Sequence, residues 1–226
     1  LRVFSGEVFG LLGHNGAGKT SLINMLAGVH APSGGKAFFF GQQAAGEGVQ
    51  AAELEAVRHR LGFCPQSNAL FPRLTGRQVL SFYAAIKGIP DSSRPAAVLC
   101  AAQAVGVEAH FDKQCRELSG GNKRKLCLAV AYLGDPSVVL LDEPSSGMDA
   151  SAAQKMRKLV RKRRKGRVTV VTTHVMSEAD ALSDRVGIMV KGQLVCLGTS
   201  QHLKGKYGTG YTVELQLQPH EAATAS

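Results

Sequence analysis

Residues 13–20 read GHNGAGKT, and their types and spacing indicate phosphate binding. The stretch fits the pattern G-x-x-x-x-G-K-[ST], a glycine-rich loop whose backbone N–H groups surround phosphate oxygens. In such a loop Lys19 reaches the β- and γ-phosphates of a nucleotide, and the Thr20 hydroxyl ligates Mg²⁺. The loop follows an apolar run at Glu7–Leu12 and precedes a helical pattern, as the motif requires. Its candidate nucleotide-binding residues are Gly13, His14, Asn15, Gly16, Ala17, Gly18, Lys19, Thr20 and Ser21.

A second candidate feature is a pair of carboxylates, Asp142 and Glu143, which directly follows the apolar run 138–141. Open α/β sheets bind ligands at the carboxyl ends of their strands, where these acids are predicted to lie. Asp142 suits Mg²⁺, reached through water, and Glu143 suits a general base for an attacking water. The alternative is an ordinary strand that ends in solvated acids. The phosphate-binding loop in the same chain favours the functional interpretation.

A third feature, Ser119-Gly120-Gly121, stands directly before a helical pattern over Asn122–Leu133. A helix N-terminus with free backbone N–H groups and a serine hydroxyl is suited to an anion. From the residues alone, this stretch would be a second phosphate site about a hundred residues after the first.

The elements that must hold these residues follow from the apolar periodicity. Strands are predicted at Glu7–Leu12, Lys36–Phe40, Leu61–Cys64, Val138–Leu141, Val168–Thr172 and Tyr211–Leu217, with a hairpin formed by Val186–Val190 and Gln193–Leu197. Helices are predicted at Lys19–Val29, Gly76–Lys87, Pro95–Val105, Asn122–Leu133 and Ser151–Lys165, and Gly46–Ala56 is predicted to be a loop that leads into a helix. The alternation favours an α/β fold with a largely parallel sheet, into which the helical block 75–132 is inserted.

The composition of the chain limits the class of protein and its possible ligands. The chain has 226 residues, of which 44% are hydrophobic, so it can bury a sizeable core. Its net charge of +10 is compatible with nucleic acid, an anionic membrane surface or an anionic ligand, and does not choose among them. The five cysteines show no metal-binding spacing and are expected to be reduced thiols. The chain starts at Leu1, close to a predicted strand, so we expect it to be an excerpt of a longer polypeptide.

Taken together, GHNGAGKT, LSGGN at 118–122 and LLDEP at 140–144 resemble, in order and separation, the nucleotide-binding domain of an ATP-binding cassette (ABC) transporter. The resemblance implies a RecA-like P-loop NTPase core with a mainly parallel sheet, an incomplete antiparallel β-subdomain and an inserted α-helical subdomain. The implied boundaries are 1–66 and 133–205 for the core, 67–132 for the helical subdomain and 206–226 for a C-terminal extension.

The resemblance also implies roles for individual residues. Gln66 matches the Q-loop glutamine, which touches Mg²⁺ and the attacking water and whose segment contacts the transmembrane parts. His174 matches the switch histidine at the γ-phosphate, and residues 145–149 match the D-loop. The implied catalytic residues are Glu143, His174 and Gln66, and the implied metal-binding residues are Thr20, Gln66 and Asp142. Ser119, Gly120 and Gly121 would contact the γ-phosphate of an ATP held by another cassette.

Several segments resemble the A subfamily of eukaryotic transporters, associated with lipid movement: GLLGHNGAGKTS, FCPQSNALFPRLT, LSGGNKRKL, DEPSSGMD and CLGTSQHLKGKYGTGY. The implied cofactors are ATP and Mg²⁺. The implied partners are the transmembrane domains of the same transporter and a second nucleotide-binding domain, with no nucleic acid. The implied location is the cytoplasmic face of a membrane, through the parent protein. The alternatives are a bacterial-type drug or polysaccharide exporter ATPase and an ABC ATPase that acts on ribosomes. A non-hydrolysing cassette would be expected to lack the acid, the histidine or the signature glycines.

The chain departs from the family pattern in two places, and it carries two basic runs. Asn122 stands where the wider family usually has Gln, which the A subfamily tolerates. Only 12 residues precede Gly13, so the aromatic residue that stacks on adenine in the family has no counterpart, and we expect weaker nucleotide binding than in a full domain. The run 161–167 is basic at six of seven positions and is interpreted as a solvated helix end closed by Gly166, in preference to a contact with anionic lipid or an acidic partner segment. The run 123–125 either adds positive potential near the nucleotide or is solvated.

Overall fold

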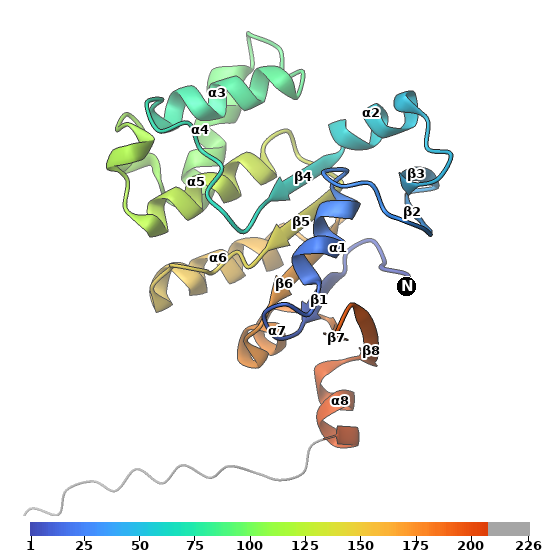
Figure 1. Ribbon diagram of the computed structural model, residues 1–226. Helices are drawn as coiled ribbons and strands as arrows, with labels where there is room; N and C mark the ends of the chain where they lie inside the picture. Colours follow the sequence, from blue (N-terminus) through green and yellow to red (C-terminus); the bar gives the residue numbers. More distant parts are fainter. Residues whose placement is uncertain (208–226) are drawn as a thin grey trace, which may run out of the picture.

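The computed structural model describes residues 1–207, and its centre is a six-stranded sheet (Figure 1). The strand order is β4-β5-β6-β1-β7-β8, and every neighbouring pair is parallel except β7 and β8. The strands are β1 (Val8–Leu12), β4 (Leu61–Cys64), β5 (Val138–Asp142), β6 (Val168–Thr173), β7 (Arg185–Val190) and β8 (Gln193–Gly198). The predicted mainly parallel α/β fold and the β7–β8 hairpin are therefore confirmed.

The sheet is buried on both faces because successive side chains of each strand point to opposite sides. In β5, Val139 and Leu141 join the core cluster on the face that also holds Val8. Val138 and Leu140 join a second cluster on the opposite face, where α1 (Lys19–Leu26) packs through Ile23. Helix α1 ends before the predicted Val29. Together the two clusters explain why short apolar runs were sufficient to predict these strands.

A second, smaller antiparallel sheet consists of β2 (Lys36–Phe39) and β3 (Gln42–Gly46), followed by helix α2 (Ala51–His59). The turn between the strands has positive φ at both Phe40 and Gly41, which is typical of a tight hairpin. No strand was predicted at β3, because its sequence QQAAG lacks the β-branched and aromatic residues that mark strands. The predicted antiparallel β-subdomain is confirmed as this pair.

Three helices are inserted between β4 and β5 and form a group to one side of the sheet, at the upper left of Figure 1. They are α3 (Gly76–Ile86), α4 (Arg94–Val105) and α5 (Gly120–Tyr132), with short 3-10 turns at Glu108–His110 and Cys115–Glu117. Helix α5 begins two residues before the predicted Asn122, because the Ser119 side chain caps it by accepting a hydrogen bond from Asn122 N at 3.3 Å. The glycines of the LSGG stretch therefore belong to the first turn of the helix.

The remaining helices are α6 (Ala150–Lys162), α7 (Met176–Leu182) and α8 (Ser200–Tyr207), and the sequence pattern predicted only the first. Asp149 caps α6 through a 2.8 Å hydrogen bond from Ala152 N. The predicted end of this helix was wrong, since α6 stops at Lys162 and Gly166 lies in the following turn with φ of 71°. The predicted strand Tyr211–Leu217 lies outside the described residues. Within residues 1–207, no helix is long and apolar enough to cross a membrane.

Candidate active site at the carboxyl edge of the sheet

The predicted site residues come from four neighbouring strands that run in the same direction. Strands β4, β5, β6 and β1 are consecutive in the sheet, so their carboxyl ends share one edge. Gln66 follows β4, Glu143 follows β5, His174 follows β6 and the loop 13–20 follows β1. Parallel pairing therefore gathers residues that are far apart along the chain.

Glu143 lies where these segments meet. Its carboxylate contacts three of the predicted residues: Oε2 accepts a hydrogen bond from Nε2 of Gln66 at 3.4 Å, and Oε1 lies 3.1 Å from Nδ1 of His174. The same Oε1 lies 3.8 Å from Nζ of Lys19. The side chain of Glu143 is 10% exposed and that of Lys19 is 5% exposed, whereas that of His174 is 49% exposed. A carboxylate paired with a cation at the base of a site open on its histidine side suits general-base chemistry.

The backbone of Glu143 is unusual for a residue with a side chain. Its φ is 47°, in the left-handed region that only glycine adopts readily. Its N–H donates to Oγ1 of buried Thr172 at 2.9 Å, so the neighbouring strand β6 holds this turn. Strained backbone conformations occur at active sites when surrounding contacts enforce them, as they do here.

The glycine-rich loop is closed around the side chain of Lys19. Its ammonium donates to the carbonyl oxygens of Gly13 at 2.7 Å and His14 at 3.1 Å. The turn of the β7–β8 hairpin supports the loop from outside, because Gly192 N donates to Ala17 O at 2.9 Å. A Cβ atom on Gly13 would lie 2.6 Å from the carbonyl oxygen of Met189, so a side chain at that position would displace the backbone. His14, Asn15, Gly16 and Ser21 are exposed around the buried lysine.

Among the residues predicted to hold the metal, Asp142 carries the buried carboxylate. Asp142 is 1% exposed; its Oδ1 accepts a hydrogen bond from the Thr172 hydroxyl, and its Oδ2 has no hydrogen-bond partner among the described residues. A buried carboxylate with an open lone pair fits a water or a cation, and Mg²⁺ usually takes few protein ligands besides water and phosphate oxygens. Across residues 1–207, no hydrogen bond joins Thr20 to Gln66 or Asp142, and no group of three or more His, Cys, Asp or Glu side chains could hold a metal.

The signature residues Ser119 and Gly120 are exposed, and Gly121 is half-buried. In the part of the chain that the structure describes, no hydrogen bond connects residues 119–121 to the loop 13–20. A Cβ atom on Gly121 would lie 3.8 Å from Gly147 O, so the start of α5 lies beside the D-loop segment 145–149. Ser119 and Gly120 are thus open to solvent at the start of α5.

Sequence reasoning missed two buried residues of this region, Thr172 and Arg124. Thr172 ties Asp142 to Glu143, and nothing distinguished it from the other threonines of its strand. Arg124 is 1% exposed, so the interpretation of the 123–125 run as solvated is wrong for its central residue, whereas added positive potential near the nucleotide stays a prediction. A signal was present, since Arg124 lies three and four residues before Cys127 and Leu128 on the buried face of α5.

The basic run 161–167 is also only partly solvated. Arg161, Lys162, Arg164 and Lys165 are exposed, as predicted. Arg167 is buried, forms an ion pair with Asp135 and lies over the ring of Tyr132 at 5.4 Å. The interpretation as a solvated run is therefore wrong for its last residue.

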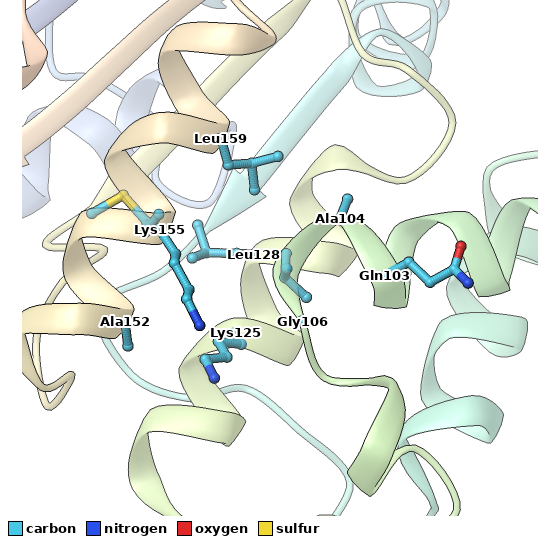
Figure 2. A pocket seen from close by; sticks show the side chains of 10 residues that line it. Gln103, Ala104, Gly106, Lys125, Leu128, Ala152, Lys155 and Leu159 are labelled. Atoms are coloured by element: carbon cyan, nitrogen blue, oxygen red, sulfur yellow. The ribbon is translucent and has the colours of Figure 1, made fainter.

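Two hollows are lined by other residues. Figure 2 shows one of about 190 Å³ between α5 and α6, where Lys125, Leu128, Ala152, Lys155 and Leu159 face the end of α4. A larger hollow of about 340 Å³ lies between the sheet and α3, lined mostly by apolar side chains together with Lys87 and Cys127. None of the predicted site residues lines either of them.

Comparison with known proteins agrees with this geometry. Residues 1–146 match the family described as ABC transporter, and residues 114–179 match an AAA domain described as a putative AbiEii toxin of a type IV toxin–antitoxin system. The chain is 44% identical over 221 residues to ATP-binding cassette sub-family A member 7 of Mus musculus, covering 97% of this chain and 10% of that protein. It is 43% identical over 219 residues to phospholipid-transporting ATPase ABCA3 of Homo sapiens, covering 96% and 12%. It is 43% identical over 218 residues to cholesterol transporter ABCA5 of Rattus norvegicus, covering 96% and 13%.

Solved structures share the fold. The dimeric post-hydrolysis state of the ATP-binding cassette MJ0796 bound to ADP and Pi superposes with a TM-score of 0.81 at 22% identity, covering 88% of each chain. The structure of cbiO1 from Clostridium perfringens superposes with a TM-score of 0.78 at 26% identity, covering 91% of this chain and 82% of that one. The fold and the strand-end residues therefore define a P-loop ATPase of the cassette type.

The chain belongs to the ABC transporter family and corresponds to the ATPase domain of such a transporter. Its similarity to sub-family A members extends over nearly the whole chain. It spans about a tenth of the length of these curated relatives, between 10% and 13%.

Proposed function

We propose that this chain binds Mg-ATP and hydrolyses it, as the nucleotide-binding domain of a transporter that moves lipid across a membrane. The observation that carries the proposal is the position of the Glu143 carboxylate, in contact with Gln66, His174 and Lys19 at the edge of the sheet. A phosphate-binding loop, a candidate base and two groups that orient the base are the parts that ATP hydrolysis requires.

The proposed chemistry begins with the glycine-rich loop. Its backbone N–H groups and Lys19 bind the phosphates, for which Lys19 exchanges its present carbonyl partners for phosphate oxygens. Glu143 then accepts a proton from the attacking water, which Gln66 orients. His174 faces the γ-phosphate from its exposed position and holds the carboxylate through Oε1. Thr20, Gln66 and Asp142 would hold Mg²⁺, which neutralises phosphate charge when bound.

The site is proposed to be completed by a second cassette. Ser119 and Gly120 are exposed and unconnected to the glycine-rich loop of their own chain in the described residues. A serine hydroxyl and the free N–H groups of a helix start, presented outward, suit the γ-phosphate of an ATP on another chain. The dimeric state of the MJ0796 cassette with ADP and Pi supports such an arrangement.

Lipid as the transported substrate is proposed from the relatives, whose names describe phospholipid and cholesterol transport. The membrane-spanning parts would belong to the parent protein, with this domain on the cytoplasmic face. The apolar hollow that Pro65, beside Gln66, helps to line offers those parts a place to dock. Such a contact would link membrane segments to the loop that carries Gln66.

The test of the proposal is Glu143→Gln in the parent transporter. The amide keeps the size of the side chain but cannot accept the proton, so hydrolysis should fall by about a hundredfold or more, while ATP binding stays intact. Glu55→Gln, in the middle of α2, is the matched control and should leave both properties unchanged. Retained turnover in Glu143→Gln would remove Glu143 from the role of base.

A further inference from the structure

We propose that Arg124 is a positioning residue that holds the backbones of Gln66 and Glu143 in register with the signature helix. The inference rests on the proposed function, because it assigns Arg124 a part in the hydrolysis that those residues would perform. Its basis is a set of contacts made by one buried guanidinium group.

The guanidinium of Arg124 donates only to backbone carbonyls, and these belong to two separate segments. On the Q-loop side, Nη1 donates to Pro65 O and, at 3.1 Å, to Gln66 O. On the Glu143 side, Nη2 donates to Asp142 O and, at 2.9 Å, to Glu143 O, and Nε donates to Pro144 O at 3.1 Å. Five N–H groups thus meet five carbonyl oxygens, which is the full donor capacity of arginine.

The two segments are neighbours because β4 and β5 pair in parallel, with Cys64 opposite Leu141. Arg124 bridges the points where both chains leave the sheet. On one side it holds the carbonyl of Gln66, and on the other it holds the carbonyls on both sides of the strained turn at Glu143. Side chains on two irregular segments keep a fixed spacing only if their backbones are held, and this guanidinium holds both.

The environment requires an arginine. Arg124 is 1% exposed and forms no ion pair with a carboxylate within residues 1–207. Its charge is therefore compensated by oriented carbonyl dipoles. A lysine keeps the charge but has three donors at a single point, so it cannot make all five of these hydrogen bonds. The flanking residues Lys123 and Lys125 are partly exposed, so the run KRK contains one buried member with a separate task.

The position of Arg124 on α5 connects its hydrogen bonds to the signature residues 119–121. Arg124 lies three and four residues after Gly121 and Gly120, one helical turn away on the same face. Under the proposed function, the start of α5 contacts ATP on a second cassette, while Arg124 holds the residues that hydrolyse ATP on its own. A displacement of the helical group would therefore move Gln66 and Glu143 through Arg124, coupling the two sites.

The experiment compares Arg124→Lys with Arg161→Lys, a conservative change at an exposed arginine of α6. In the parent transporter, Arg124→Lys should lower kcat about tenfold or more, with KM and the affinity for a fluorescent ATP analogue within about twofold of wild type. Arg161→Lys should match wild type in all three. An unchanged kcat in Arg124→Lys would overturn the inference, and so would a loss that merely equals the loss of folded protein.

A second measurement separates positioning from general stability. If Arg124 acts through Gln66, adding Arg124→Lys to Gln66→Ala should lower kcat by much less than the product of the two separate effects. Full multiplicativity would contradict the inference. If wild type does not hydrolyse ATP, the proposed function fails. Hydrogen exchange then still tests whether Arg124 holds the two backbone segments. Amides of residues 66–68, 143, 145 and 146 should then exchange faster in Arg124→Lys than in Arg161→Lys, and equal rates would overturn the inference.

Discussion

The carboxylate of Glu143 and the imidazole of His174 lie 3.1 Å apart, although 31 residues separate them along the chain. They meet because β5 and β6 are adjacent parallel strands, with Asp142 opposite Thr172. The contact places a base and a group that can orient it at the same edge of the sheet, and it leads directly to a first prediction.

His174→Ala should lower the rate of ATP hydrolysis by about a hundredfold and leave nucleotide affinity unchanged. The imidazole is half exposed and holds only one oxygen of Glu143, so its loss removes orientation without disturbing the core. Steady-state kinetics and an ATP-analogue titration measure the two effects. His202→Ala, at an exposed histidine of α8, is the control. A kcat within about twofold of wild type for His174→Ala would contradict the assigned role.

Lys19→Ala should reduce ATP affinity by about tenfold or more, because the phosphates lose their buried cation. The substitution also leaves the carboxylate of Glu143 without its 3.8 Å partner. Equilibrium binding to the isolated chain tests this directly, with Lys158→Ala on the exposed surface of α6 as the control. Equal affinity of the two variants would remove Lys19 from the phosphate site.

Gly120→Asp should abolish most hydrolysis in the assembled transporter while ATP binding to the isolated chain is retained. A Cβ atom at Gly120 meets no atom within 4 Å, so the fold should tolerate the change, and the new carboxylate would repel a γ-phosphate from another chain. Gly34→Asp, at another exposed glycine with open space around its Cβ, is the matched control. Equal turnover of both variants would contradict a signature that acts across cassettes.

For the isolated chain, the rate of hydrolysis per molecule should rise with concentration, because two chains are needed to complete a site. The rate should approach a plateau once the chains are paired, and sedimentation in the presence of ATP should show the dimer over the same range. A rate per molecule that does not depend on concentration would show that one chain suffices.

Cysteine labelling should follow burial. Cys100 is exposed, whereas burial raises the pKa of the Cys64 thiol to about 12 and that of Cys127 to about 11. An alkylating reagent that reacts only with thiolates should therefore modify Cys100 at pH 8 in the native chain. It should modify Cys64 and Cys127 only after unfolding. Mass spectrometry of alkylated peptides measures the order. Fast native labelling of Cys64 would contradict its place in the core.

Lys87 should make stability depend on pH at alkaline values. Its amine donates to Leu133 O at 2.9 Å, and burial lowers its pKa from 10.5 to about 8. Between these values the unfolded chain binds more protons than the folded chain, so the Lys87 contribution to the free energy of unfolding rises with pH. Below pH 8 the amine is charged in both states, and burying that charge lowers the free energy of unfolding by the full amount. The wild-type advantage over Lys87→Met should grow by on the order of 1–3 kcal/mol from pH 8 to 10.5. Urea unfolding measures it, and a flat difference would contradict the burial of this amine.

Much of the fold could be predicted because its signals are local. Leu61–Cys64 and Val138–Leu141 are short apolar runs bounded by turn residues, and the structure places strands at both. Strand β3 could not be predicted, because QQAAG has no apolar pattern and pairs only because β2 lies beside it. The end of α6 was predicted too late, since charges that suit a helix terminus also suit the turn that follows it.

The sequence by itself determined which chemical groups are available: a phosphate loop with Lys19, the acids Asp142 and Glu143, and the signature Ser119-Gly120-Gly121, each recognisable from spacing within a few residues. Only the tertiary structure decided which of them meet. The strand order β4-β5-β6-β1 differs from the chain order, so the contacts of Glu143 with Gln66 and Lys19 follow from sheet pairing. The burial of Arg124 belongs to the same class, because its five carbonyl partners lie on two segments that are brought together only when β4 and β5 pair.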